Sequence, residues 1–130
     1  MTHVPSTDTP TVLLVDDEVE LADSLALWLE RRCEVRVAYS GREALQSFDE
    51  DVDVVFLDQN LPGLPGETVL HELRRDSKPN TPAVVMLTAT PSDELSELPA
   101  DDVLTKPVTK SDIFDAVARF ADDAHEVTAE

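Results

Sequence analysis

Three short apolar runs constrain the fold of this chain more than any other feature. They occupy residues 11–16 (TVLLVD), 53–58 (DVVFLD) and 83–88 (AVVMLT). Continuous runs of β-branched and aliphatic residues indicate strands that are covered on both faces, and such strands are typical of parallel sheets. The runs therefore predict a central sheet enclosed between layers of helices.

Strand-like and helix-like stretches alternate along the rest of the sequence. Two further strands are predicted at residues 34–40, where apolar and polar residues alternate, and at residues 102–107. The spacing of apolar residues predicts helices at 20–32, 41–51, 66–76 and 109–120. Ser40 is the predicted N-cap of the second helix. This order predicts an α/β fold, a doubly wound five-stranded parallel sheet with helices on both faces.

The length of 130 residues fits one domain whose core needs neither a disulfide nor a structural metal. We expect the domain to span residues 11–121, with a disordered tail at 1–10 and a C-terminal tail or the start of a continuation at 122–130. The single cysteine, Cys33, is interpreted as a structural thiol. No apolar run reaches the roughly 20 residues of a membrane span, and a signal peptide is not evident. We therefore expect a soluble, cytoplasmic protein.

The charge balance is strongly acidic, with 28 acidic and 10 basic residues and a formal net charge of −18. Such a surface repels nucleic acid phosphates and anionic lipids, so we expect no direct nucleic acid binding and no membrane association. High salt screens self-repulsion of this kind. The charge therefore favours a halophilic protein, with an ordinary acidic domain as the alternative.

Polar side chains end the predicted strands at the edge where ligand sites of parallel sheets lie. The residues at these strand ends are Asp16, Asp17, Asp58, Thr88 and Lys106. Carboxylates about 4 Å apart repel by roughly 4 kcal/mol at an effective dielectric constant near 20, so the acids must take up protons or bind a cation. Oxygen ligands of this kind suit Mg²⁺, while a hydroxyl and an ammonium group suit phosphoryl oxygens.

Four motifs in this sequence resemble the receiver domain of two-component response regulators, in the same order and at similar spacing. They are VLLVDDE, VVFLDQNLPG, VVMLTA and LTKP. The resemblance covers residues 11–121 and implies a flavodoxin-like receiver topology. It also implies a role in phosphorelay signalling, in which the domain receives a phosphoryl group and changes conformation to control a downstream effector.

The resemblance implies a role for each residue that contacts the phosphoryl group. Asp58 matches the phosphoacceptor, which takes the group from a sensor histidine kinase or a phosphotransfer protein. Thr88 matches the hydroxyl that contacts the phosphoryl group and moves on activation. Lys106 matches the cation that binds a phosphoryl oxygen, and its peptide bond to Pro107 is cis in the family.

The resemblance also implies a site for Mg²⁺ or Mn²⁺. Asp17 matches a direct ligand of the ion, and Asp16 matches the neighbouring acid that assists it. Asp58 and the backbone carbonyl of Asn60 match the remaining protein ligands.

Simpler roles exist for several of these side chains. Asp16 and Asp17 are placed to cap the helix that follows them, since acids are favoured at helix N-termini. Lys106 is close in sequence to Asp101 and Asp102, with which it could form a surface ion pair of little energetic value.

Two other functional classes use similar sites. A Mg²⁺-dependent phosphatase of the haloacid dehalogenase type also has a strand-end aspartate nucleophile, but it places a second acid two residues later, where this chain has Asn60. A flavodoxin-like flavin-binding protein needs a neutral phosphate loop, and the acidic strand ends disfavour it.

The sequence departs from the family pattern on the output side. Val103 occupies the position three residues before Lys106, where the family has a Tyr or Phe that swings inward on activation. The stretch between Thr88 and Lys106 is also short, so we expect its helix to be little more than two turns, at residues 92–98 with Ser92 as cap.

Overall fold

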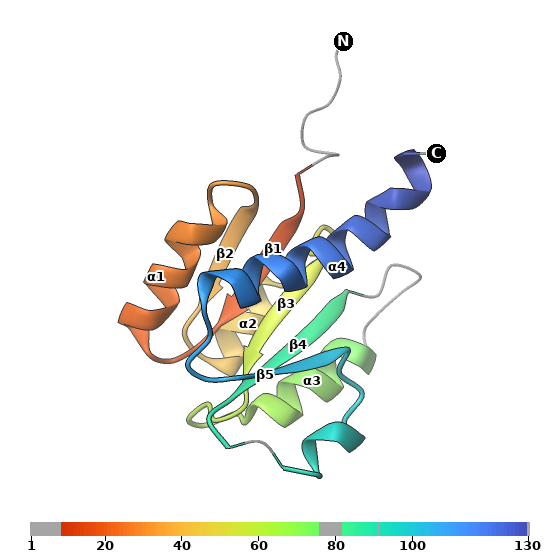
Figure 1. Cartoon of the computed structure of the whole chain (residues 1–130). Helices are drawn as coiled ribbons and strands as arrows, with labels where there is room; N and C mark the ends of the chain where they lie inside the picture. The colour runs from red at the N-terminus through yellow and green to blue at the C-terminus, as the bar shows by residue number, and fades with distance from the viewer. Residues whose placement is uncertain (1–8, 76–81, 91, 130) are drawn as a thin grey trace.

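The computed structural model describes residues 9–75, 82–90 and 92–129, without the side chains of residue 96 and of residues 122–129. Its centre is a five-stranded parallel sheet in the order β2-β1-β3-β4-β5 (Figure 1). The strands are β1 (Thr11–Val15), β2 (Glu34–Ala38), β3 (Val54–Asp58), β4 (Ala83–Thr88) and β5 (Asp102–Thr105). The predicted sheet is confirmed.

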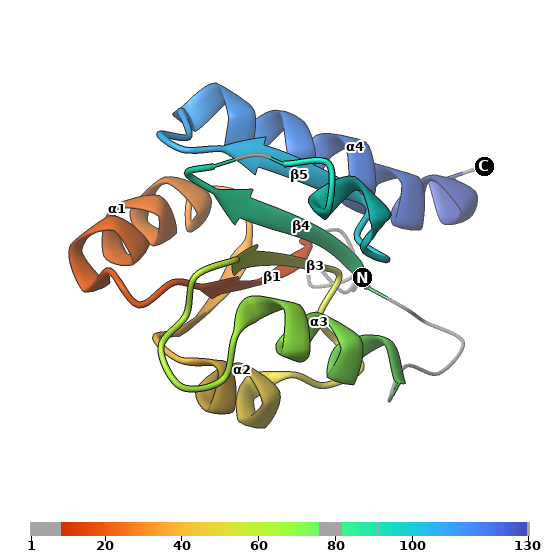
Figure 2. The ribbon, with the colours of Figure 1, turned by 90° about the horizontal axis from the view of Figure 1, so that it is seen from below.

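Helices cover both faces of this sheet, as predicted. The helical elements are α1 (Val19–Leu29), α2 (Gly41–Ser47), α3 (Gly66–Arg75), the short 3₁₀ helix η2 (Leu95–Glu97) and α4 (Lys110–Ala129). Helices α1 and α4 lie on one face, and α2 and α3 lie on the other (Figure 2). None of the described helices is long and apolar enough to cross a membrane.

Alternate residues of the central strands supply two hydrophobic cores. Leu14 and Phe56 face α1 and α4, whereas Leu13 and Leu57 face α2 and α3. Successive side chains of a strand point to opposite faces, so a strand that is buried on both faces must be apolar throughout. Residues 54–57 of β3 follow this rule, whereas its last residue, Asp58, is a buried carboxylate that departs from it.

The register of the sheet brings the strand ends to one edge. Val15 pairs with Leu57 across β1 and β3, and Asp58 pairs with Leu87 across β3 and β4. Thr88 pairs with Thr105 across β4 and β5. The residues that end these strands or follow them are therefore neighbours in space.

Several predicted boundaries differ from the structure. Helix α1 ends at Leu29 and α2 at Ser47, both earlier than predicted, while α4 continues past Phe120 to Ala129. The Ser40 cap is confirmed, because its hydroxyl accepts a hydrogen bond from the Glu43 N–H at 3.1 Å. The predicted tail at residues 1–10 lies outside the described residues, apart from the last two.

The helix predicted at residues 92–98 is wrong, because the described part of this segment forms only the single turn η2. Its hydrogen bonds join residues three apart, such as Leu95 N–H to Ser92 O at 3.2 Å. A segment of about two turns cannot offset the cost of helix nucleation by itself. In addition, the proline at position 99 disfavours a helical residue before it, and Leu98 is extended with ψ of 153°.

Arg74 ties this segment to α3 and β4. Its guanidinium donates to Pro99 O, Pro82 O and Asp101 Oδ2, each at 2.8 Å. The same Asp101 oxygen accepts the Val84 N–H at 2.7 Å. One side chain of α3 thus donates hydrogen bonds to residues that precede β4 and to residues that follow it in the sequence.

Cys33 is buried, with 7% of its surface exposed, in the core beside α1 and α4. Burial raises the pKa of its thiol. Both features agree with the structural role predicted for this residue.

Candidate functional site

Four strands deliver polar side chains to the carboxyl edge of the sheet. Asp16 follows β1 and is held there by a hydrogen bond from its N–H to Ala38 O at 3.1 Å. Asp58 and Thr88 are the last residues of β3 and β4. Lys106 follows β5, where its N–H donates to Thr88 O at 2.7 Å. Main-chain hydrogen bonds therefore fix the backbone from which these side chains extend.

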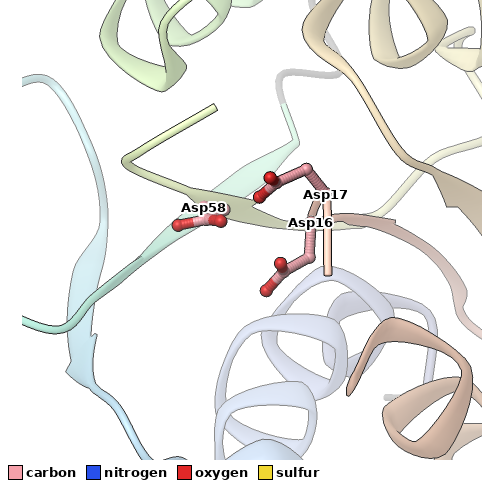
Figure 3. Close-up of side chains that lie close together, drawn as sticks. All are labelled: Asp16, Asp17 and Asp58. Carbon is pink, nitrogen blue, oxygen red and sulfur yellow. The ribbon is translucent and has the colours of Figure 1, made fainter. Parts of the chain in front are cut away.

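Three carboxylates gather beyond the ends of β1 and β3 (Figure 3). Asp16, Asp17 and Asp58 each offer an oxygen, and these atoms lie within 4.8 Å of one another. Asp16 is fully buried and Asp58 is 4% exposed, whereas Asp17 is more accessible. The acid cluster predicted from the sequence is present.

Lys106 supplies the positive charge at this site. Its Nζ lies 3.2 Å from Asp16 Oδ2, 3.4 Å from Asp58 Oδ1 and 3.6 Å from Glu18 Oε1. The alternative surface pairing is wrong, because the two acids near Lys106 in sequence have other partners. Asp101 pairs with Arg74, and Asp102 pairs with Arg119.

The ionisation of the site reflects its burial. The pKa of Asp58 is raised to about 6, chiefly by burial and then by the charge of Asp16, while the Asn60 N–H and Lys106 oppose part of the rise. For Lys106, burial lowers the pKa, but the charges of Asp16 and Asp58 outweigh burial and the net pKa is raised. The lysine therefore stays protonated at neutral pH, while one carboxyl of the cluster is costly to ionise.

One oxygen of Asp16 lacks a hydrogen bond. Asp16 Oδ1 accepts the Glu18 N–H at 3.0 Å, but the N-cap of α1 is Glu18 itself, so the capping role predicted for Asp16 is wrong. Asp16 Oδ2 is buried and accepts no hydrogen bond, although Lys106 Nζ lies nearby. A buried carboxylate oxygen without a hydrogen bond, beside two further acids, fits a site for a hard divalent cation.

Asn60 lies two residues past Asp58 and stabilises its carboxylate. The Asn60 N–H donates to Asp58 Oδ1 at 3.2 Å. The role of its backbone carbonyl as a metal ligand stays a prediction. The cis peptide bond between Lys106 and Pro107 is present, as the resemblance implied.

Gly66 allows α3 to begin directly against the end of β3. A Cβ atom at this position would lie 2.2 Å from Asp58 O and 3.0 Å from Gln59 Cα. Both neighbours are backbone atoms, so no side-chain movement could make room for it. Glycine is therefore required where α3 packs against the backbone of the strand end.

Gln59 is a site residue that the sequence reasoning missed. Its Oε1 accepts the hydroxyl proton of Thr88 at 2.5 Å, and the Thr88 oxygen in turn accepts the Thr90 N–H at 3.0 Å. The available signal was a polar residue directly after Asp58, at the edge where the other polar side chains meet.

Comparisons with known proteins agree with this arrangement. Residues 12–118 match the family model described as the response regulator receiver domain. The RegX3 sensory transduction protein of Mycobacterium tuberculosis is 41% identical over 111 residues, 80% of this chain and 47% of that protein. A Haloferax volcanii protein with a proposed role in transcriptional regulation is 42% identical over 108 residues, 82% of this chain and 18% of that protein. The chain thus spans less than half the length of these relatives.

Solved structures with the same fold include two receiver proteins. The chemotaxis protein CheY4 of Vibrio cholerae has a TM-score of 0.78 and 28% identity, and the match covers 86% of this chain and 98% of that chain. A CheY-like receiver domain protein of Methanospirillum hungatei has a TM-score of 0.77 and 26% identity, with coverage of 92% and 98%. These findings do not support the phosphatase alternative. The chain belongs to the receiver domain family of two-component response regulators.

Proposed function

We propose that the domain accepts a phosphoryl group on Asp58 from a sensor histidine kinase or a phosphotransfer protein. The proposal rests on one observation, the placement of Asp58. This carboxylate ends a fully buried strand, with Asp16 and Asp17 within 4.8 Å and the Lys106 ammonium 3.4 Å away. A nucleophile, a set of cation ligands and a partner for a phosphoryl oxygen thus meet at one point.

The transfer is a single displacement at phosphorus. An oxygen of the Asp58 carboxylate attacks the phosphorus atom of a phosphohistidine, and the new O–P bond forms as the P–N bond breaks. The imidazole nitrogen keeps the electron pair of the broken bond, which leaves a neutral imidazole when the other ring nitrogen carries the proton. The product is an acyl phosphate on Asp58.

Residues of this chain bind the charge that arrives with the phosphoryl group. Lys106 is already oriented toward Asp58 by its ion pairs, so it can neutralise a phosphoryl oxygen without being recruited from solvent. Thr88 ends the neighbouring strand, and its one hydroxyl proton, which Gln59 Oε1 accepts in the unphosphorylated protein, could pass to another phosphoryl oxygen.

Asp16, Asp17, Asp58 and the backbone carbonyl of Asn60 would hold Mg²⁺ or Mn²⁺. When bound, such an ion supplies positive charge that cancels the repulsion among the carboxylates and attracts phosphoryl oxygen. Asp16 Oδ2 supports this proposal, because it is a buried oxygen that accepts no hydrogen bond from the described residues. Lys106 Nζ lies 3.2 Å away but does not form a hydrogen bond with it.

The proposed role is that of a signalling protein, which assists only its own phosphorylation and dephosphorylation. A conformational change would then act on a downstream effector, either elsewhere in a longer protein or on a separate partner. Because a histidine kinase uses ATP, we expect the domain to be phosphorylated in the cytoplasm. The net charge of −18 further supports a halophilic protein that binds neither nucleic acid nor membranes directly.

Incubation with acetyl phosphate and Mg²⁺, followed by intact mass spectrometry, tests this proposal. The wild-type protein should gain one phosphoryl group, and the gain should disappear when EDTA removes the metal. Asp58→Asn should show no adduct. Asp51→Asn removes an exposed carboxylate just before the same strand and should be phosphorylated like the wild type.

Two results would contradict the proposal. One is a wild-type protein that gains no phosphoryl group with Mg²⁺ present. The other is an adduct that persists unchanged in Asp58→Asn, which would place the modification on a different residue.

A further inference from the structure

The Thr88 hydroxyl is fully engaged before any phosphoryl group arrives. Its oxygen accepts the Thr90 N–H at 3.0 Å, and its proton goes to Gln59 Oε1 at 2.5 Å. A hydroxyl has only one proton to donate. Thr88 therefore cannot donate to a phosphoryl oxygen on Asp58 unless it first gives up its bond to Gln59.

The position of Gln59 is fixed by its main chain. Its N–H donates to Leu87 O at 2.9 Å, which continues the β3–β4 pairing one residue beyond Asp58. Its carbonyl accepts the N–H of Gly66 at 3.2 Å. Thr88 is 1% exposed, so water has little access to its hydroxyl. The side-chain bond between Gln59 and Thr88 is thus supported from both strands.

We propose that Gln59 is a positioning residue that holds the Thr88 hydroxyl in the unphosphorylated protein. Phosphorylation of Asp58 offers a charged acceptor for the same proton, and a charged acceptor forms a stronger hydrogen bond than an amide oxygen. Thr88 then exchanges partners and releases the Gln59 side chain. This inference rests on the proposed function of Asp58, because the competing acceptor is the phosphoryl group.

The exchange gives the domain a response that does not depend on an aromatic ring. Val103 has no ring to move between solvent and core, and it is already partly buried against the core on the face of the sheet that α3 covers. Gln59 contacts Thr88 directly, and its carbonyl is bonded to the first residue of α3. Release of Gln59 would therefore act on the connection between β3 and α3.

The affinity for beryllium trifluoride with Mg²⁺, a mimic of the phosphoryl group on aspartate, tests the proposal. Gln59→Met keeps an unbranched side chain of similar length but removes the amide acceptor. Without a bond to break, the variant should bind the mimic more tightly than the wild type, by between about twofold and tenfold. Titration followed by fluorine NMR gives both affinities.

The effect must pass through Thr88, which a double-mutant cycle can show. In the Thr88→Val background, which removes the hydroxyl at nearly constant volume, Gln59→Met should leave the affinity unchanged. Gln46→Met is the matched control, since it makes the same substitution at an exposed position of α2. It should bind the mimic as the wild type does. Gln59→Leu repeats the test if the methionine variant does not fold.

The outcomes separate this inference from the proposed function. A wild type that neither binds the mimic nor accepts a phosphoryl group would overturn the role of Asp58. A wild type that does both, with a Gln59→Met variant of equal or weaker affinity, would overturn the role of Gln59 alone. Equal tightening in the presence and absence of the Thr88 hydroxyl would also overturn it.

Discussion

Burial and neighbouring charges make the Asp58 carboxylate costly to keep ionised. Its pKa is raised to about 6, first by burial and then by Asp16, even though Lys106 and the Asn60 N–H oppose the shift. A group in this state favours any event that places positive charge beside it. Binding of a divalent cation is such an event.

The raised pKa of Asp58 predicts the pH dependence of stability in the metal-free protein. In the unfolded chain the carboxyl has its ordinary pKa of 3.8, so the folded protein holds the proton more tightly between pH 3.8 and about 6. Stability contributed by this group is therefore lost as pH rises through that window. Asp58→Asn removes the effect and should be more stable than the wild type by on the order of 2 kcal/mol at pH 7.5, with little difference near pH 4.

Urea unfolding in EDTA across this pH range measures the difference. Asp51→Asn controls for the loss of one negative charge, because that side chain is exposed and remote from the strand end. If the free energies of unfolding of Asp58→Asn and the wild type differ by the same amount from pH 4 to pH 7.5, the pKa of Asp58 is not raised in the folded protein.

Among the elements, the strands follow from the sequence and the segment between β4 and β5 does not. Three short continuous apolar runs are compatible with few structures other than buried strands. Asp16, Asp58 and Thr88 lie at the ends of these strands, so the strands determine their positions. The segment after β4 has too few residues for its local preferences to decide its conformation. Long-range contacts with α3 hold it instead, and these are not visible as a periodic pattern.

The missed contact between Gln59 and Thr88 has a similar cause. Each residue alone is an unremarkable polar side chain near a strand end. Their pairing depends on the register in which Gln59 N–H continues the β3–β4 ladder to Leu87 O, so that the two side chains meet. The sequence predicts which strands are neighbours, but hydrogen bonds between side chains require the register and the rotamers.

Arg74 should contribute more to stability than its neighbour Arg75, because Arg74 bonds residues outside α3 and Arg75 pairs within the helix. Arg74 is partly buried and donates to Pro99 O, Pro82 O and Asp101 Oδ2. Arg74→Ala should lower the free energy of unfolding by about 1–3 kcal/mol through these lost bonds and the unpaired acceptors left behind.

Arg75→Ala is the matched control from the same turn of α3. Arg75 is mostly exposed and pairs only with Glu72 among the contacts described, so its loss should cost less than about 0.5 kcal/mol. Chemical denaturation of both variants gives the comparison. Equal losses would mean that the segment between β4 and β5 is not anchored through Arg74.

The net negative charge of the whole molecule lowers the stability of its folded state. A charge of −18 on 130 residues leaves a mutual repulsion that only counterions can relieve. The cores on the two faces of the sheet must offset that repulsion in dilute salt, whereas at about 1 M salt the Debye length falls to roughly 3 Å.

The melting temperature should therefore rise markedly between dilute and molar KCl. Sucrose at equal osmolality controls for exclusion of solutes from the protein surface, and it should produce a smaller rise. Differential scanning calorimetry measures both. A melting temperature that is indifferent to KCl, or that rises equally with sucrose, would identify an ordinary acidic domain rather than a halophilic one.

We propose Asp58 as the residue that carries the phosphoryl group, and its position can be read directly by chemical labelling. Reduction of the phosphorylated protein with borohydride cleaves an acyl phosphate and converts the aspartate into homoserine, which peptide sequencing by mass spectrometry can locate. We expect homoserine at position 58 after treatment with acetyl phosphate and Mg²⁺, and an unmodified residue there when either reagent is omitted. Homoserine at position 16 or 17, or a phosphoryl group that resists borohydride, would contradict this proposal.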